Sequence, residues 1–171
     1  MDHHGFLLQQ IERYQALGEN GCETNTTAIA NTLLDFGNKT PRNGYIIRDE
    51  CIMKAMSTVV LTVSENLGAD KPVHQEVDHP SRNSVNLNEK PILVIECKHH
   101  NNLNESFKEE DFHQITQYIL SYKLPIGILL SEFKVVIIKA SFSERLPIFK
   151  QEKELNLPED NQILLDYINE L

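Results

Sequence analysis

The hydrophobic positions of this chain switch between helical and strand periodicity, and they predict a layered domain. Apolar residues recur at helical intervals over residues 6–17, 26–36, 46–67, 108–122 and 163–171. Shorter apolar runs predict strands over residues 72–78, 84–87, 91–98, 126–130 and 135–140. This order of elements predicts an α/β domain, bordering on α+β, with a mixed central sheet flanked by helices.

The whole chain, residues 1–171, is expected to form a single domain. Residues 1–45 are an N-terminal helical extension, with Thr26 or Thr27 as the cap of its second helix. Residues 46–140 form the core, and residues 141–171 supply a loop over 147–160 and a last helix.

The segment 46–67 allows two interpretations. Its β-branched residues at 58–63 favour a strand, whereas its length and spacing favour a helix, which is the prediction made here. Glu50 then lies in the first helical turn, as a partner of the helix dipole or as a catalytic carboxylate.

The central strand, residues 91–98, is apolar on both faces until it turns polar at its far end. Strand side chains alternate between faces, so Glu96 and Lys98 share one face with Val94, and Cys97 lies on the other. A carboxylate at the end of a buried strand needs a partner or a metal ion. Either the strand leaves the core there as an ordinary surface pair, or the two charges form a site.

Composition narrows the class of protein. Hydrophobic residues make up 40% of the chain and the net charge is −9, which argues against a generic basic surface for nucleic acids. Residues 112–151 nevertheless carry five basic residues against two acidic ones. The three separated cysteines favour a reducing compartment, and no apolar run predicts a membrane span, so we expect a cytoplasmic or nuclear protein. The motifs of nucleotide hydrolases, esterases, dinucleotide enzymes and zinc proteases are absent.

Other polar residues can join the charged end of the central strand. Asp78 and Glu76 end the preceding predicted strand, and His99 and His100 follow Lys98, where they line a site or lie in a solvated loop. Gln114 and Tyr118 are four residues apart, so they share one face of the next helix. Two carboxylates suit Mg²⁺ or Mn²⁺, which lowers the pKa of bound water and stabilises charge on a phosphoryl oxygen.

The run from Pro91 to Lys98 resembles the third core strand of the PD-(D/E)XK nuclease superfamily. Gln114 and Tyr118 resemble the helix motif of its RecB-like branch, and residues 124–138 resemble closing strands of type I restriction subunits. The resemblance implies a restriction-endonuclease-like core that hydrolyses phosphodiester bonds with Mg²⁺ or Mn²⁺. The residues it implicates are the catalytic Asp78, Glu96, Lys98 and Gln114, the metal ligands Asp78 and Glu96, and the substrate contact Tyr118. Glu50 matches more loosely, as a metal ligand on the helix before the first strand. His99 and His100 are added as substrate contacts because they directly follow Lys98.

The sequence departs from this family at one acid. The motif's aspartate belongs to the second strand, where Asn86 stands; Asp78 is the nearest aspartate and is the one predicted to serve. We therefore expect a nuclease acting on nucleic acid, DNA rather than RNA. An inactive nuclease-like module that binds nucleic acid or protein, and an interaction domain using the acidic C-terminal helix, are the alternatives. A homodimer is left open.

Overall fold

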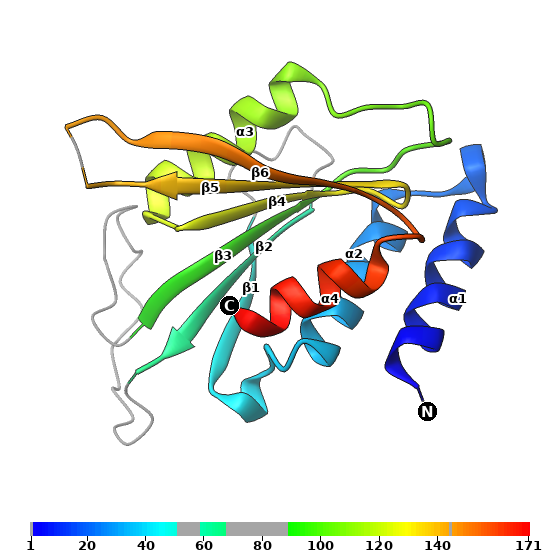
Figure 1. Cartoon of the computed structure of the whole chain (residues 1–171), viewed down its shortest axis with the longest axis horizontal. Coiled ribbons are helices and arrows are strands. Elements are labelled where there is room, and N and C mark those ends of the chain that lie inside the picture. The colour runs from blue at the N-terminus through cyan, green and yellow to red at the C-terminus, as the bar shows by residue number, and fades with distance from the viewer. Residues whose placement is uncertain (1, 51–58, 68–88, 144) are drawn as a thin grey trace.

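The computed structural model describes residues 2–50, 59–67, 89–143 and 145–171, in which four α-helices flank a six-stranded mixed sheet (Figure 1). The helices are α1 (His3–Gln15), α2 (Glu23–Phe36), α3 (Glu109–Tyr122) and α4 (Asn161–Glu170), with short 3₁₀ turns η1 (Gly18–Asn20) and η2 (Pro41–Asn43). The strands are β1 (Tyr45–Glu50), β2 (Val59–Asn66), β3 (Glu89–Cys97), β4 (Ile126–Leu130), β5 (Lys134–Ser141) and β6 (Ile148–Asn156).

The strands lie side by side in the order in which they occur along the chain. Strands β1, β2 and β3 form an antiparallel meander. Helix α3 then returns the chain across the sheet, so that β4 pairs parallel to β3. Strands β5 and β6 follow as antiparallel neighbours. The predicted α/β class with a mixed sheet is therefore confirmed.

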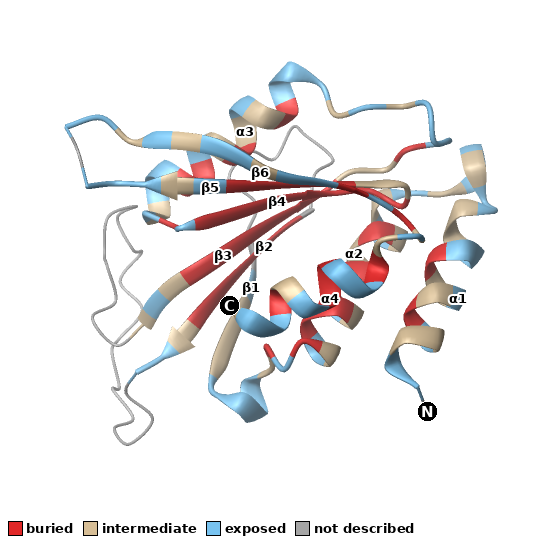
Figure 2. Ribbon diagram, viewed as in Figure 1, coloured by how far each residue is buried: buried red, intermediate tan, exposed pale blue. Residues whose placement is uncertain are grey.

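The helices form layers on both faces of the sheet. Helices α1, α2 and α4 cover one face and α3 covers the other (Figure 1). Each face has its own apolar core, and β3 and β4 are buried between the two layers (Figure 2). Burial on both faces explains why these strands read as nearly continuous apolar runs in the sequence.

The prediction of a helix over residues 46–67 is wrong. Residues 45–50 form β1 and residues 59–66 form β2. Val60 faces the apolar core below α3, whereas Leu61 and Val63 face the core below α1, α2 and α4. Even the polar Thr62 and Ser64 of this strand are buried, so β2 lacks the regular alternation of apolar and exposed polar residues that marks a half-buried strand, and its spacing imitated that of a helix. The β-branched residues gave the better signal.

Two smaller predictions also need correction. Residues 148–156, expected in a loop, form the edge strand β6, whose exposed polar residues hide the alternation of a strand. Helix α2 begins before Thr26: Cys22 is its N-cap, and the Cys22 amide donates to Oδ1 of Asn25 (2.9 Å). The other predicted helices and strands are confirmed, except residues 72–78 and 84–87, which lie outside the described residues.

Among the helices that the structure describes, none combines the length and the apolar character needed to cross a membrane.

A glycine in β4 sets how closely α3 approaches the sheet. A Cβ atom at Gly127 would lie 2.6 Å from Cδ1 of Ile119 and 3.1 Å from Cδ1 of Ile115, both buried on α3. We expect Gly127→Ala to lower the free energy of unfolding by about 1–3 kcal/mol, since overpacking a core forces side chains and backbone to shift. Urea denaturation measures this change.

Gly5 in α1 is the matched control, because a Cβ atom there would meet only the Asp2 side chain, at 3.5 Å or more. Gly5→Ala should leave the protein as stable as the parent or more stable by about 0.5–1 kcal/mol, as alanine favours helix. Equal stability of the two variants would contradict the close packing of α3 on β4.

Candidate active site

The candidate site lies at the carboxyl end of β3, where the central strand emerges between the helical layers. Glu96 is fully buried, with 0% of its surface exposed, and Lys98 is half-buried. The Lys98 amide donates to the carbonyl oxygen of Leu130 (2.9 Å), so the parallel pairing with β4 continues past the last residue of β3. Backbone pairing therefore fixes both charged residues on the face of the sheet that α3 covers.

Three side chains from two elements meet the Lys98 ammonium. Its Nζ lies 3.0 Å from Oε1 of Glu96 and 3.2 Å from Oδ1 of Asp111, and it donates to Oε1 of Gln114 (3.3 Å). Asp111 and Gln114 are three residues apart on α3 and face the same side of the helix. The predicted clustering of Glu96, Lys98 and Gln114 at one end of a mixed sheet is thus confirmed, as is the buried position of Cys97.

The Glu96 carboxylate is incompletely compensated. Lys98 is within ion-pair distance, but neither carboxylate oxygen of Glu96 accepts an aligned hydrogen bond from the described residues. Burial raises the pKa of Glu96 to about 7, against the opposing effect of the Lys98 charge. A fully buried carboxylate with this pKa, next to a specific charged partner, is a feature of functional sites.

Lys98 stays charged in this environment. Burial alone would lower its pKa, but Glu96 and Asp111 outweigh burial, and the pKa of Lys98 is raised above its ordinary value. At neutral pH the side chain is therefore an ammonium group that can only donate hydrogen bonds.

Glu23, in the first turn of α2, is an acid that the sequence analysis missed. It is half-buried, and burial raises its pKa, opposed by the charges of Lys98 and His99. Its charge in turn contributes to the raised pKa of Glu96. The hydroxyl of Thr26, one turn further along α2, donates to the carbonyl oxygen of Lys98 (3.1 Å), which brings this turn against the end of β3.

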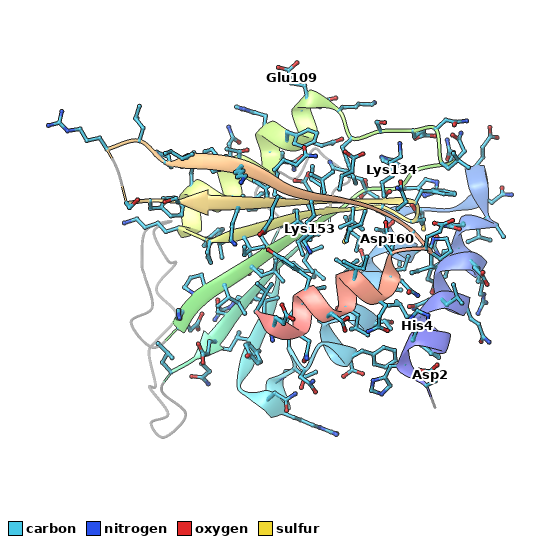
Figure 3. The ribbon with its side chains drawn as sticks, in the orientation of Figure 1. Asp2, His4, Glu109, Lys134, Lys153 and Asp160 are labelled. Atoms are coloured by element: carbon cyan, nitrogen blue, oxygen red, sulfur yellow. The ribbon has the colours of Figure 1, made fainter. Side chains whose placement is uncertain are left out.

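Asp111 was also missed, and it has a structural role as well. Its Oδ2 accepts from the Lys108 amide (2.8 Å) and caps α3, while its Oδ1 faces Lys98. Glu109, in the same turn, instead extends away from the body of the protein (Figure 3). The position of Asp111 three residues after the cap is a recognisable sequence signal for its capping role, though not for its contact with Lys98.

Another buried acid, Glu132, lies beside the site in the turn between β4 and β5. Its side chain is 1% exposed, and its Oε1 lies 2.7 Å from Nδ1 of His99. Its Oε2 accepts from the amide of His100 (3.0 Å). Burial lowers the pKa of His99, but the bond to Glu132 outweighs it and the pKa is raised. Burial lowers the pKa of His100, whose ring packs against Phe107.

Tyr118 and Glu50 are the other predicted site residues that the structure describes. Tyr118 is 4% exposed and lies in the apolar core beneath α3. Glu50 belongs to strand β1 rather than to the first turn of a helix, so its role as a helix-dipole partner is wrong. Asp78, Glu76 and Asn86 lie outside the described residues.

Strand register shows which residues flank Glu96 in the sheet. Val60 is directly opposite Glu96 on β2, and Glu50 is opposite Val60 on β1. The one acid of β2 is Glu65, which stands opposite Lys90 in the strand register, at the other end of β2 from Val60. Within the described parts of the chain, no three histidine, cysteine, aspartate or glutamate side chains are grouped so as to hold a metal ion.

Comparison of the chain with models of known protein families, with curated proteins and with solved structures found no match.

The raised pKa of Glu96 predicts how stability depends on pH. Between pH 4.5 and 7 the unfolded chain releases the Glu96 proton while the folded protein keeps it, so stability falls as the pH rises through this window. Replacing Glu96 by the neutral isostere Gln removes this loss. Glu96→Gln should gain up to about 3 kcal/mol relative to the parent between pH 5 and pH 8, as one pKa unit corresponds to about 1.4 kcal/mol.

Urea denaturation at the two pH values measures this difference. Glu154→Gln is the matched control, because Glu154 stands in the same row of the sheet, on β6, with an exposed side chain. It measures the effect of changing the net charge alone. A Glu96→Gln difference that does not exceed the control at pH 8 would contradict the buried, raised-pKa carboxylate.

Proposed function

We propose that this chain is a metal-dependent nuclease that hydrolyses phosphodiester bonds of nucleic acid. The observation that carries the proposal is the fully buried Glu96 carboxylate, which shares its face of the central strand with the Lys98 ammonium. A buried carboxylate that lacks aligned hydrogen bonds is a poor contributor to stability alone, since its desolvation is costly. Such a group is better explained by a bound cation.

The donor chemistry of the site fits Mg²⁺ or Mn²⁺. Glu96 would hold the ion. Glu23 is the second carboxylate of the site, because its charge contributes to the raised pKa of Glu96. Mg²⁺ characteristically uses one or two protein carboxylates and completes its coordination with water and substrate phosphate, so a full protein cage is not required. When bound, the ion would activate water and stabilise negative charge on the phosphate.

The chain's own residues divide the remaining tasks. Because the raised pKa keeps Lys98 protonated, its ammonium acts as a donor to a phosphate oxygen or to the attacking water, and not as a base. Gln114 and Asp111 accept from or pair with this ammonium and fix its direction. The electrostatic field at the phosphate is thereby preorganised before substrate arrives.

The order of the elements supports the resemblance on which this proposal draws. The Glu-x-Lys pair ends the third strand of an antiparallel meander, and α3 with Gln114 follows it. The resemblance also placed an acid on the helix before the first strand. Helix α2 precedes β1, so Glu23 takes this place instead of Glu50.

One observation favours a second function, that of an inactive module which binds nucleic acid or a protein partner. The resemblance calls for an acid in the second strand, but the residue beside Glu96 on β2 is Val60. A valine offers no oxygen to a metal ion. Unless another carboxylate completes the site, substrate would be held without being cleaved.

A cleavage assay with Mg²⁺ or Mn²⁺ on single- and double-stranded DNA and RNA tests the proposal. Glu96→Gln should abolish metal binding and cleavage together, because it removes the anionic ligand. Lys98→Met should retain metal affinity within about threefold but reduce the cleavage rate by about 100-fold or more, in the range seen when one preorganised donor is lost. Calorimetric titration with Mn²⁺, run beside the assay, separates the two roles.

Lys134→Met is the matched control, since the Lys134 ammonium donates to Ser106 at an exposed position and does not contact Glu96 or Asp111. It should retain both metal binding and cleavage. Substrate binding by a parent protein that cleaves none of the four substrates would favour the inactive module, and unchanged cleavage in Glu96→Gln would rule out the assigned site.

A further inference from the structure

The two proposed metal-binding carboxylates come from segments far apart in the sequence. Glu96 is fixed by its strand, but Glu23 depends on how the first turn of α2 docks against the end of β3. Among the described residues, this docking includes the bond from the Thr26 hydroxyl to the Lys98 carbonyl. Hydroxyl hydrogen bonds of this kind are weak constraints, so a further contact is expected to hold the turn.

His99 lies at the junction of these segments. Its Nδ1 meets Oε1 of Glu132 at 2.7 Å, and its Nε2 meets Oδ1 of Asn101 at 2.9 Å. Both ring nitrogens are thus engaged by acceptors, which fixes the plane of the ring. The backbone of Gly18, in the turn that leads to α2, also accepts from the ring and helps to raise its pKa.

The ring of His99 packs directly against the residue that precedes the cap of α2. A Cβ atom at Gly21 would lie 2.5 Å from Cε1 and 3.1 Å from Nδ1 of His99. Only glycine permits this approach, although the Gly21 backbone itself is extended, with φ −77° and ψ 172°. Gly21 is two residues before Glu23, so the position of the ring sets the start of the helix that carries this acid.

Glu132 is the anchor of this arrangement. Its carboxylate bonds the His99 ring and the His100 amide at once, and its side chain is 1% exposed. The turn around it is held from outside by Gln15 of α1, whose Nε2 donates to the Glu132 carbonyl (2.7 Å) and to the Leu157 carbonyl (2.8 Å). Glu132 therefore has fixed partners on two other segments, residues 99–100 and α1, and a buried group held in this way can define a distance that an exposed pair cannot.

We propose that Glu132 is a positioning residue that acts through His99 to hold the first turn of α2, and with it Glu23, against Glu96 and Lys98. Its consequence for metal affinity rests on the proposed function, but the geometric role does not. Residues that orient metal ligands from behind typically change metal affinity by about 10–100-fold when they are replaced.

Amide hydrogen exchange, followed by mass spectrometry, tests the geometric role without any metal. In Glu132→Leu, peptides covering residues 22–28 should exchange about tenfold faster or more, because the turn opens locally, while peptides from α4 exchange as in the parent. Glu132→Gln should stay close to the parent, since an amide can still bond both His99 and His100.

Gly21→Ala reaches the same contact from the opposite side and leaves Glu132 intact. Alanine is compatible with the Gly21 backbone, but its Cβ must displace the His99 ring, so residues 22–28 should again exchange faster. Gly21→Ala therefore tests the positioning role even if Glu132→Leu does not fold. Glu152→Leu is the control: it removes a glutamate that bonds Tyr167 (2.7 Å) and Lys139 (3.1 Å), and should speed exchange in α4 instead.

Mn²⁺ titration of the same proteins measures the consequence for the site. Glu132→Leu and Gly21→Ala should bind Mn²⁺ about 10–100-fold more weakly than the parent, and Glu152→Leu should bind as the parent does. Unchanged exchange over residues 22–28, or an equal increase in every segment, would overturn the positioning role. A parent without Glu96-dependent Mn²⁺ binding would contradict the proposed function, and the exchange result would still decide the role of Glu132.

Discussion

The buried carboxylate of Glu96 is the constraint to which the rest of the site responds. A charge removed from water at the end of a buried strand must be neutralised by a proton, a cationic side chain or a metal ion. Lys98 supplies part of this compensation from two residues further along the same face. Asp111 and Gln114 in turn hold the ammonium in place from α3. The ion pair thus couples the central strand to the helix that crosses it.

The same end of the sheet holds the buried acid Glu132, and Glu96 and Glu132 organise opposite sides of one junction. Glu96 faces α3, whereas Glu132 binds the chain just beyond β3 and, through His99, reaches the approach to α2. Two helical layers that are otherwise separated by the sheet therefore meet around residues 96–100. This convergence brings Glu23 into the electrostatic field of Glu96, although 73 positions of sequence separate them, counted from residue 23 to residue 96.

Val60 bears on both proposed functions, the metal-dependent nuclease and the inactive binding module. Its side chain belongs to the apolar core beneath α3 and stands beside Glu96 in the sheet. An apolar neighbour increases the desolvation of the carboxylate, which raises its pKa and strengthens the demand for a cation. The same valine has no oxygen atom with which to coordinate a cation. The site therefore combines a strong electrostatic preference for positive charge with few protein oxygens to coordinate it.

The sequence by itself determined the local features of this protein. The alternation of β3 placed Glu96 and Lys98 on one face and Cys97 in the core, and the helical spacing of residues 108–122 placed Gln114 where it could face them. Local periodicity failed at β2, which is buried on both faces, and at β6, which is an exposed edge. Only the tertiary structure decided that Asp111 pairs with Lys98, that Glu23 lies within the electrostatic influence of Lys98, and that Glu132 bonds the His99 ring. Contacts between distant segments depend on docking and register, which leave no periodic trace in the chain.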